Sequence, residues 1–383
     1  MRLLIDIGHP AHVHYFKHFA GIMRERGNQI YFSVRDKESA ISLMETLDFD
    51  FEARGKGGKS AVTKLLKLLP TDIRLYRMAR RFRPDIILSF SSPYAAHTAK
   101  VLGVPHIALD DTEHAIYGHA LYRPFTDAIL SPSCYTGPLH KKQILFSSYL
   151  ELCHLHPNRF SPDPQILKEL NLRKDEPYAV LRLVAWDAHH DAGQTGFSGG
   201  TVRDLVQHLE KKCRVFLSSE KTPDKELLPY QLTVHPSSFH DVLAFARLYI
   251  GEGSTTAAES SVLGTPSIYV NSLKVGYCTE LEQRYGLCRH IQRPEDIAIA
   301  ADEILTDQSA QAGFAQKRET MLREKIDPVA FLVWFVEEWP ESRRVMRDDP
   351  DFQNRFSSAG ISIGASSPYG RSNPSPQRSQ EAP

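Results

Sequence analysis

Residues 248–259 read Leu-Tyr-Ile-Gly-Glu-Gly-Ser-Thr-Thr-Ala-Ala-Glu, and residues 263–271 read Leu-Gly-Thr-Pro-Ser-Ile-Tyr-Val-Asn. The short apolar run that ends in Gly-x-Gly predicts a strand and a tight turn. Hydroxyl residues able to cap follow, then a helix of small residues, which Gly264 and Pro266 end before the next apolar run. Strand, glycine turn, helix and strand make half of a doubly wound α/β unit, in which ligands bind beyond the carboxyl ends of the strands.

The glycine turn is the first candidate site. A turn that opens a helix leaves backbone N–H groups free and presents the positive end of the helix dipole, which suits a phosphate. We therefore expect Gly253, Ser254 and Thr255 to bind a diphosphate. Arg182 lies near the end of an earlier expected strand. Its guanidinium can donate two parallel hydrogen bonds to the same diphosphate.

Glu259 has two interpretations. It can complete a capping box with Thr256, or it can accept hydrogen bonds from ribose hydroxyls one turn beyond the phosphate-binding amides. The segment resembles the donor-nucleotide motif of GT-B glycosyltransferases and of UDP-N-acetylglucosamine 2-epimerases, in which a glutamate precedes Gly-x-Pro by five residues. Glu259, Gly264 and Pro266 match. The resemblance implies that Glu259 binds the ribose of a nucleotide sugar.

The composition is that of a globular protein. With 383 residues the chain is long enough for two domains. Its 46 basic and 46 acidic residues cancel, so bulk charge gives no support for nucleic-acid binding. Five scattered cysteines, the absence of a signal-peptide pattern and the lack of a run of roughly 18 apolar residues favour a cytoplasmic location.

The order of the expected elements predicts two Rossmann-like α/β domains that face each other across a cleft. We expect the first domain over residues 1–155 and the second over 165–330, because prolines between them prevent regular structure. Strands are expected at 3–7, 29–34, 85–90, 106–109 and 128–130, and then at 177–184, 214–218, 231–234, 248–250 and 267–270.

Two segments follow the second domain. The apolar, aromatic segment at 331–336 predicts a late helix, and resemblance to GT-B proteins implies that residues 331–345 pack back on the first domain. Residues 357–383 contain Ser, Pro, Gly, Gln and Arg with almost nothing apolar, so we expect a disordered tail.

Histidines gather in the first loop, where His9, His12 and His14 lie within six residues. They are polar surface residues, metal ligands that lack an evident fourth partner, or a general base at the cleft. The position favours His12 as a base that deprotonates a sugar hydroxyl, with His9 or Asp111 orienting it. Gly8 to Val13 also resembles the N-terminal loop of the peptidoglycan N-acetylglucosaminyltransferase, whose His-Val pair His12 and Val13 match.

Further polar loops follow other expected strands. After 106–109 come residues expected to hold substrate or do acid/base work, although one aspartate can instead cap the next helix: Asp110, Asp111, Glu113 and His114. The expected strand 177–184 is followed by Asp187, His189, His190 and Asp191. Their composition alone indicates a metal site. Adjacent histidines point apart, so we assign Asp187, His190 and Asp191 to the substrate instead.

We also expect Ser219 and Glu220 to contact the nucleotide sugar. The nucleotide base is expected to lie against the backbone near Phe239 and His240. No metal is required if Arg182 and the helix dipole stabilise the leaving diphosphate. The expected co-substrate is therefore a nucleotide-diphosphate sugar, with UDP as the nucleotide and no separate cofactor.

Taken together, the loops at 8–12, 110–114, 186–191, 219–220 and 251–255 identify the chain as resembling the DUF354 family of GT-B-like proteins. The wider resemblance implies a glycosyltransferase that acts in envelope or surface-polysaccharide synthesis. A 2-epimerase and an inactive nucleotide-sugar-binding protein are the alternatives. Residues 91–93 are Ser-Ser-Pro where the epimerases carry Gly-Asp-Thr, which argues against epimerisation.

Residues 54–83 hold ten basic side chains against the single acid Asp72: Arg54, Lys56, Lys59, Lys64, Lys67, Arg74, Arg77, Arg80, Arg81 and Arg83. Such a run is most often a solvated helix face. With leucines interleaved, it is also suited to an anionic membrane surface that carries a lipid-linked acceptor.

Overall fold

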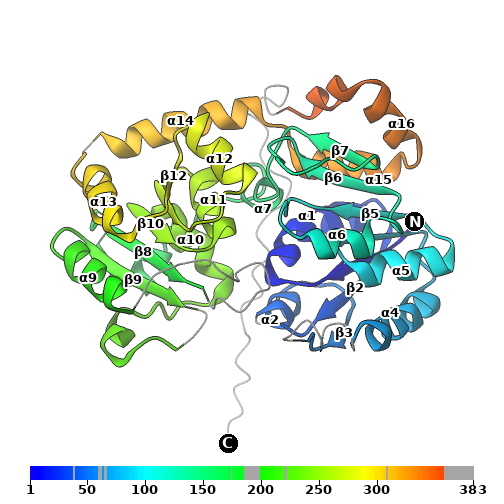
Figure 1. Ribbon diagram of the computed structural model, residues 1–383, viewed down its shortest axis with the longest axis horizontal. Coiled ribbons are helices and arrows are strands. Elements are labelled where there is room, and N and C mark those ends of the chain that lie inside the picture. The colour runs from blue at the N-terminus through cyan, green and yellow to red at the C-terminus, as the bar shows by residue number, and fades with distance from the viewer. Residues whose placement is uncertain are drawn as a thin grey trace, which may run out of the picture.

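The computed structural model describes residues 1–37, 39–58, 63, 67–173, 175–184, 199–219, 222–307 and 309–357. Two parallel sheets form two halves that lie side by side, with α7 (Leu152–Leu155) between them (Figure 1). This confirms the predicted α/β fold class. Arg182, Ser219, Gly253 and Asp111 all come at or just after carboxyl ends of strands.

The first sheet contains seven strands in the order β3-β2-β1-β4-β5-β6-β7, all parallel. Its strands are β1 (Arg2–Ile7), β2 (Gln29–Arg35), β3 (Phe51–Gly55), β4 (Ile86–Phe90), β5 (His106–Leu109), β6 (Ala128–Pro132) and β7 (Gln143–Phe146). Its helices are α1 (Pro10–Glu25), α2 (Ala40–Glu45), α4 (Leu68–Phe82), α5 (Pro93–Leu102) and α6 (Ile116–Tyr122). Chain order reverses between the neighbours β1 and β4.

The second sheet contains five parallel strands in the order β12-β11-β10-β8-β9. These are β8 (Tyr178–Leu183), β9 (Arg214–Ser219), β10 (Leu248–Gly251), β11 (Ser267–Val270) and β12 (Cys288–Ile291). The α-helices of this part are α8 (Ile166–Glu169), α9 (Gly199–Leu209), α10 (Phe239–Phe245), α11 (Ser254–Leu263), α12 (Gly276–Gln283), α13 (Ile297–Thr306) and α14 (Ala310–Glu324). Short 3-10 helices are η2 (Lys225–Tyr230), η3 (Pro236–Ser238) and η4 (Pro294–Asp296). Chain order reverses between β8 and β10.

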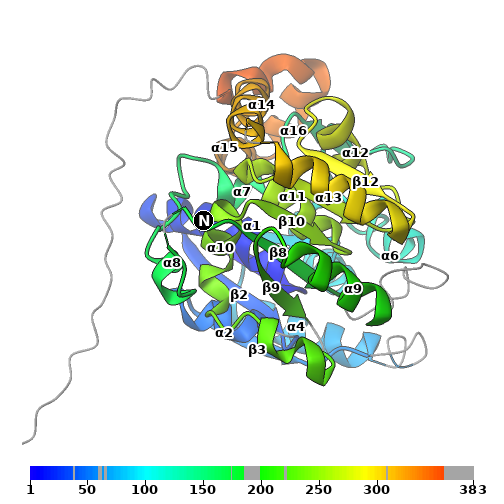
Figure 2. The same ribbon diagram turned by 90° about the vertical axis from the view of Figure 1, so that its left-hand side faces the viewer.

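The final helices lie on the first half. After α14, which runs along the second half, α15 (Pro328–Glu337), α16 (Glu341–Asp348) and η5 (Pro350–Phe356) lie beside β6 and β7 (Figures 1 and 2). Phe331 and Phe335 of α15 belong to the same buried core as Phe16 and Phe19 of α1. Gln353 adds a polar contact, because its Oε1 accepts a 2.6 Å hydrogen bond from the Ser147 amide. Burying these aromatic rings supplies most of the apolar area that attaches the C-terminal helices.

Three strands of the structure were not predicted from the sequence, and one predicted strand does not form. β3, β7 and β12 are edge strands, and their short, partly polar sequences lack the continuous apolar run of a central strand. The strand predicted at 231–234 is wrong. Only Gln231 forms an isolated bridge, to Leu217, since the chain arrives there from η2 and must turn again at Pro236.

The basic segment is less uniform than its composition. Arg54 is buried, and its Nε donates a 2.8 Å hydrogen bond to Asp6, whose other oxygen accepts a 2.6 Å bond from Ser92. Arg54 therefore cannot contact a membrane, which corrects its place in the proposed basic surface. Arg81 forms an ion pair with Glu52. Lys59 and Lys64 lie outside the described residues.

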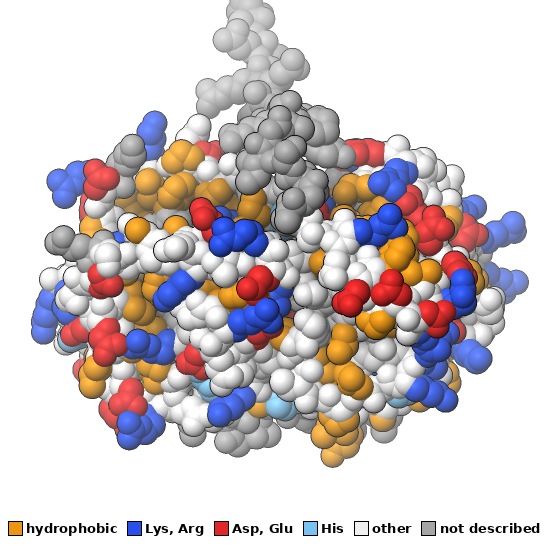
Figure 3. All heavy atoms as spheres, turned by 90° about the horizontal axis from the view of Figure 1, so that it is seen from above, with side chains coloured by type: hydrophobic (Ala, Val, Ile, Leu, Met, Phe, Trp, Pro, Cys, Tyr) orange, Lys and Arg blue, Asp and Glu red, His pale blue; other side chains and the backbone are white. Residues whose placement is uncertain are grey.

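The described face in Figure 3 shows acidic and basic side chains interspersed rather than one dominant charge, in keeping with the balanced composition. Among the described residues, no helix has the length and apolar character needed to cross a membrane.

Candidate functional site

The candidate site lies where chain order reverses in each sheet. At such a point the two neighbouring crossovers leave on opposite faces, and the carboxyl ends of the strands enclose a crevice. In the second sheet Gly251 of β10 pairs with Arg182 of β8, so both residues stand at this crevice. In the first sheet β1 leads through Gly8 and His9 into α1 at the corresponding position.

The turn before α11 contains two glycines, Gly251 and Gly253. A Cβ on Gly251 would lie 2.2 Å from the Tyr249 hydroxyl, so this close approach requires glycine. Gly253 is the N-cap of α11 and offers no side-chain cap to the helix. Gly253, Ser254 and Thr255 are half-buried, whereas the next seven residues of the helix are buried. The free N–H end of α11 is thus its accessible part.

Arg182 lies beside this turn. Its guanidinium donates a 2.7 Å hydrogen bond to Ser218 Oγ and stacks over the Phe239 ring at 5.3 Å. Ser219 ends the neighbouring strand β9 and is half-buried. The predicted nucleotide-side residues Arg182, Ser219 and Phe239 are therefore brought to one edge of the sheet. Glu220 lies outside the described residues, as do the predicted substrate residues Asp187, His190 and Asp191.

Glu259 does not form the capping box, because Gly253 rather than Thr256 is the N-cap. Its Oε1 instead accepts hydrogen bonds from Nε2 of His240 at 3.1 Å and Nε2 of His154 at 3.3 Å. Burial acts to raise its pKa, but the two histidines hold the pKa of Glu259 well below its usual value. A ribose would have to replace these donors, so the ribose role of Glu259 and the base contact near His240 stay predictions.

Glu113 and His114 connect the two halves, and their assignment to the substrate stays a prediction. Glu113 Oε1 accepts a 3.0 Å hydrogen bond from the amide of Gly276, the first residue of α12. His114 Nε2 donates a 2.8 Å bond to the Lys274 carbonyl. The α12 helix has no side-chain cap of its own, so Glu113 supplies one from the other half.

Asp110 is also structural. Its Oδ1 accepts a 3.1 Å hydrogen bond from the Thr112 amide, and Oδ2 contacts the Tyr122 hydroxyl and His119 Nε2. Burial opposes ionisation, yet hydrogen bonds from His119 and Tyr122 lower the pKa of Asp110. The helix α6 begins after Ala115 without a side-chain cap, so neither aspartate caps it. Asp110 therefore holds its loop rather than a substrate.

Asp111 has the opposite electrostatics. Burial, followed by the negative charges of Asp110 and Glu113, raises its pKa to about 7. Burial and Asp111 likewise raise the pKa of Glu151, a residue of the interdomain segment that no sequence motif indicated. Both carboxyl groups also act on Tyr277, whose hydroxyl donates a 2.7 Å bond to Ser254 at the start of α11. Tyr277 thus contacts the start of α11 and lies within the electrostatic influence of both acids.

His9 and His12 adopt specific local roles. His9 is the N-cap of α1, with its Nδ1 accepting a 3.2 Å hydrogen bond from the Ala11 amide. The Nδ1 of His12 accepts a 3.2 Å bond from the Gly8 amide, so the neutral ring carries its proton on Nε2. Burial lowers the pKa of His12 well below its usual value. In this state Nε2 donates, which argues against His12 as the general base.

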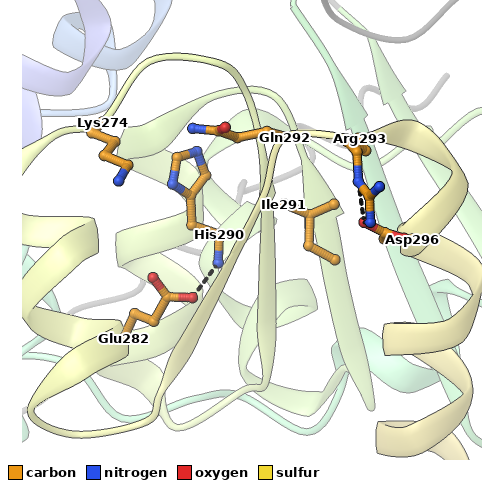
Figure 4. Close-up of a pocket in the computed structure, with 7 residues that line it drawn as sticks. All are labelled: Lys274, Glu282, His290, Ile291, Gln292, Arg293 and Asp296. Atoms are coloured by element: carbon orange, nitrogen blue, oxygen red, sulfur yellow. Dashed lines mark hydrogen bonds and ion pairs between the residues drawn. The ribbon is translucent and has the colours of Figure 1, made fainter.

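A pocket of about 380 Å³ opens at the carboxyl end of β12 (Figure 4). Lys274, His290 and Gln292 line one side, while Arg293 pairs with Asp296 on the other at 2.8 Å. The Lys274 backbone is the group that His114 binds, so this pocket adjoins the contact between the halves.

The fold defines the class. Solved structures with this arrangement include a spinosyn rhamnosyltransferase in complex with spinosyn aglycone, with a TM-score of 0.59 at 13% identity, covering 88% of this chain and 100% of that one. MurG of Acinetobacter baumannii gives a TM-score of 0.56 at 12% identity, over 88% and 99% of the chains. A putative UDP-N-acetylglucosamine 2-epimerase of Listeria monocytogenes gives 0.61 at 10% identity, over 88% and 96%. The protein has the GT-B fold of glycosyltransferases and such epimerases.

The chain belongs to the DUF354 family, described as proteins of unknown function, whose pattern matches residues 1–291. This confirms the family predicted from the loop motifs. An uncharacterized protein of Methanocaldococcus jannaschii is 24% identical over 278 residues, which is 69% of this chain and 80% of the relative.

We predict that Gly276→Ala separates the two halves. The added Cβ would lie 2.0 Å from the Cys134 carbonyl oxygen and 2.6 Å from Glu113 Oε1, so the contact must open. We expect a loss of about 1–3 kcal/mol in the free energy of unfolding, the range for overpacking a close contact, together with a larger radius of gyration in X-ray scattering.

Gly313→Ala is the matched control, because Gly313 lies in α14 with nothing within 4 Å of the added Cβ. It should raise helix stability slightly. Equal stability and equal dimensions for the two variants would contradict the proposed docking of α12 on Glu113.

Proposed function

We propose that the protein transfers a sugar from a nucleotide-diphosphate sugar to an acceptor hydroxyl. The observation that carries the proposal is the accessible N-terminus of α11, where Ser254 accepts a 2.7 Å hydrogen bond from Tyr277. The charge of the buried acid Asp111 contributes to the raised pKa of the same tyrosine. An anion-binding helix end and an acid with a pKa near neutrality therefore share one region between the halves.

The donor diphosphate is proposed to bind the amides of Gly253, Ser254 and Thr255, with Arg182 beside it. A solved complex of the spinosyn rhamnosyltransferase contains thymidine diphosphate, with a TM-score of 0.58 at 12% identity over 88% of this chain and 100% of that one. In our proposal the helix dipole and Arg182 stabilise charge on the departing nucleotide diphosphate, and UDP is the preferred nucleotide.

Asp111 is proposed as the general base. Its ionised form takes the proton of the acceptor hydroxyl while the acceptor oxygen bonds to the anomeric carbon and the bond to the diphosphate breaks. A pKa of about 7 leaves a substantial ionised fraction at neutral pH and keeps the group basic enough to accept the proton. His12, with its proton on Nε2, serves as a donor to the acceptor sugar.

A specific observation also supports the 2-epimerase alternative. That reaction eliminates and re-adds the nucleotide diphosphate with the help of carboxyl groups, and Asp111 and Glu151 are two buried carboxyl groups whose pKa values are both raised. Against it, the segment after β4 carries Ser92, which caps α5 and binds Asp6, instead of a free carboxylate. We therefore place sugar transfer first.

The acceptor is proposed to be a lipid-linked sugar held at an anionic membrane. The exposed face of α4 combines Leu69 and Ile73, 67% and 41% exposed, with Arg77 and Arg80. Apolar side chains beside cations suit the boundary between anionic headgroups and lipid chains. This surface excludes the buried Arg54.

Arg182→Ala is expected to weaken UDP binding, measured by calorimetry, by about 1.5–3 kcal/mol, because a charged hydrogen bond to the diphosphate is lost. Arg214→Ala is the control, because Arg214 is exposed and lies at the amino end of β9, whereas Arg182 lies near the carboxyl end of β8. Equal, weak binding of UDP, TDP, ADP and GDP by all three proteins would contradict the donor site.

The rate of sugar transfer should depend on the ionisation of Asp111. We expect kcat/KM to increase about tenfold per pH unit below pH 7 and to level off above it, because the base must be unprotonated. Asp111→Asn should lower kcat by about 10²–10⁴. Asp85→Asn is the control, because the asparagine keeps an acceptor for the Arg2 amide at the other end of the sheet. It should change neither kcat nor the pH dependence of kcat/KM.

A pH-independent rate that Asp111→Asn leaves unchanged would exclude Asp111 as the base. Incubation with the donor alone separates the two reactions, since a C2-inverted sugar nucleotide formed without acceptor would assign the protein as an epimerase.

The membrane proposal predicts salt-sensitive sedimentation with vesicles that contain anionic phospholipid. Charge reversal of Arg77 and Arg80 to glutamate should abolish binding, since each basic residue near such a surface contributes about 1 kcal/mol. Reversal of the exposed Lys168 and Lys211 on the other half is the matched control. If wild type binds no vesicles at low salt, a soluble acceptor replaces the lipid-linked one.

A further inference from the structure

Three histidines from three helices converge between the halves. His14 comes from α1, His154 from α7 and His240 from α10, and one ring nitrogen of each lies within 4.8 Å of the other two. Their ring centroids are 5.0, 4.9 and 4.9 Å apart. Among the described residues this is the one group of three or more metal-ligand side chains.

A carboxylate completes the group. Glu259 Oε1 lies 3.3 Å from His154 Nε2 and 3.1 Å from His240 Nε2. Ligand atoms bound to tetrahedral zinc at about 2.0–2.1 Å are separated by roughly 3.3–3.4 Å. The two distances from Glu259 Oε1 are therefore close to those between zinc ligands, and His14 offers a ring nitrogen within 4.8 Å of those of His154 and His240.

The cluster also contains buried nitrogen atoms without partners. Nδ1 of His14 and Nδ1 of His154 are both inaccessible and form no hydrogen bond, and the His154 side chain as a whole is 1% exposed. A buried polar atom without a partner costs about 1–3 kcal/mol, and an ion bound at Nδ1 of His14 would supply the missing partner of that atom. Hydrogen bonding to Glu259 alone thus leaves the cluster incompletely satisfied.

We propose that His14, His154, His240 and Glu259 bind one divalent transition-metal ion of the zinc type. Three imidazoles and one carboxylate suit zinc, whereas calcium and magnesium select oxygen ligands. In this proposal Glu259 and His240 are metal ligands, which replaces the ribose and base contacts expected for them from the sequence.

The ion would connect the two halves. His14 belongs to the first half, whereas His240 and Glu259 belong to helices of the second. Glu259 lies five residues along α11 from Ser254, about 7.5 Å at 1.5 Å per residue. A bound ion therefore fixes α11 against α1 and sets the position of the candidate phosphate site relative to the first half.

Tag-free protein, treated with chelator and dialysed, is titrated with Co²⁺ and Zn²⁺. The proposal predicts one ion per chain, the visible ligand-field spectrum of four-coordinate cobalt, its replacement by zinc, and an increase in Tm with zinc. His14→Gln and His240→Gln should each weaken zinc binding by roughly a hundredfold or more, because loss of even an outer partner costs about 10–100-fold.

His235→Asn is the control. It removes a neighbouring histidine outside the cluster and retains an acceptor for the Ser237 amide, so zinc binding should not change. A six-coordinate cobalt spectrum in wild type, or equal zinc affinity in wild type, His14→Gln and His240→Gln, would overturn the proposal. The wild-type cobalt spectrum decides the question even if a variant fails to fold.

Discussion

The arrangement of the two halves depends on a carboxylate that caps a helix of the opposite domain. Glu113 Oε1 accepts the Gly276 amide at the start of α12 and also bonds to Thr136 within its own half. The close approach leaves no space for a Cβ at residue 276. Because an uncapped helix end is costly to bury, this one contact stabilises both the helix and the docking of the halves.

The electrostatics of the site follow from that docking. Asp111 is buried near the negative charges of Asp110 and Glu113, and Tyr277 of the docked α12 bonds to Ser254 while the charges of Asp111 and Glu151 contribute to raising its pKa. Asp110 stays ionised because His119 and Tyr122 contact its carboxylate. A second negative charge beside Asp110 is unfavourable, so the pKa of Asp111 is raised. One loop thus supplies a structural acid, a capping acid and an acid suited to proton transfer.

The fold was predictable because its signals are local. The run at 248–259 specifies strand, turn and helix by apolar length and glycine position, and it forms β10 and α11 as expected. Edge strands such as β12, Cys288–Ile291, were missed because pairing on one side stabilises a short polar segment that has no pattern of its own.

The site was harder to predict, since partners come from distant parts of the chain. Asp110, Asp111 and Glu113 look alike in sequence, and only His119, Gly276 and the surrounding burial separate their roles. Glu259 was expected to meet a ribose, but its neighbours His154 and His240 lie 105 and 19 residues away. The position of Glu151 and His154 at the end of the expected first domain gave no sign that both would be buried.

The central claim is that the free N-terminus of α11 binds a nucleotide diphosphate. A crystal structure of the protein grown with UDP tests it most directly. The account predicts phosphate oxygens within hydrogen-bonding distance of the Ser254 and Thr255 amides and of the Arg182 guanidinium. Diphosphate density bound elsewhere, with the start of α11 occupied only by solvent, would contradict it.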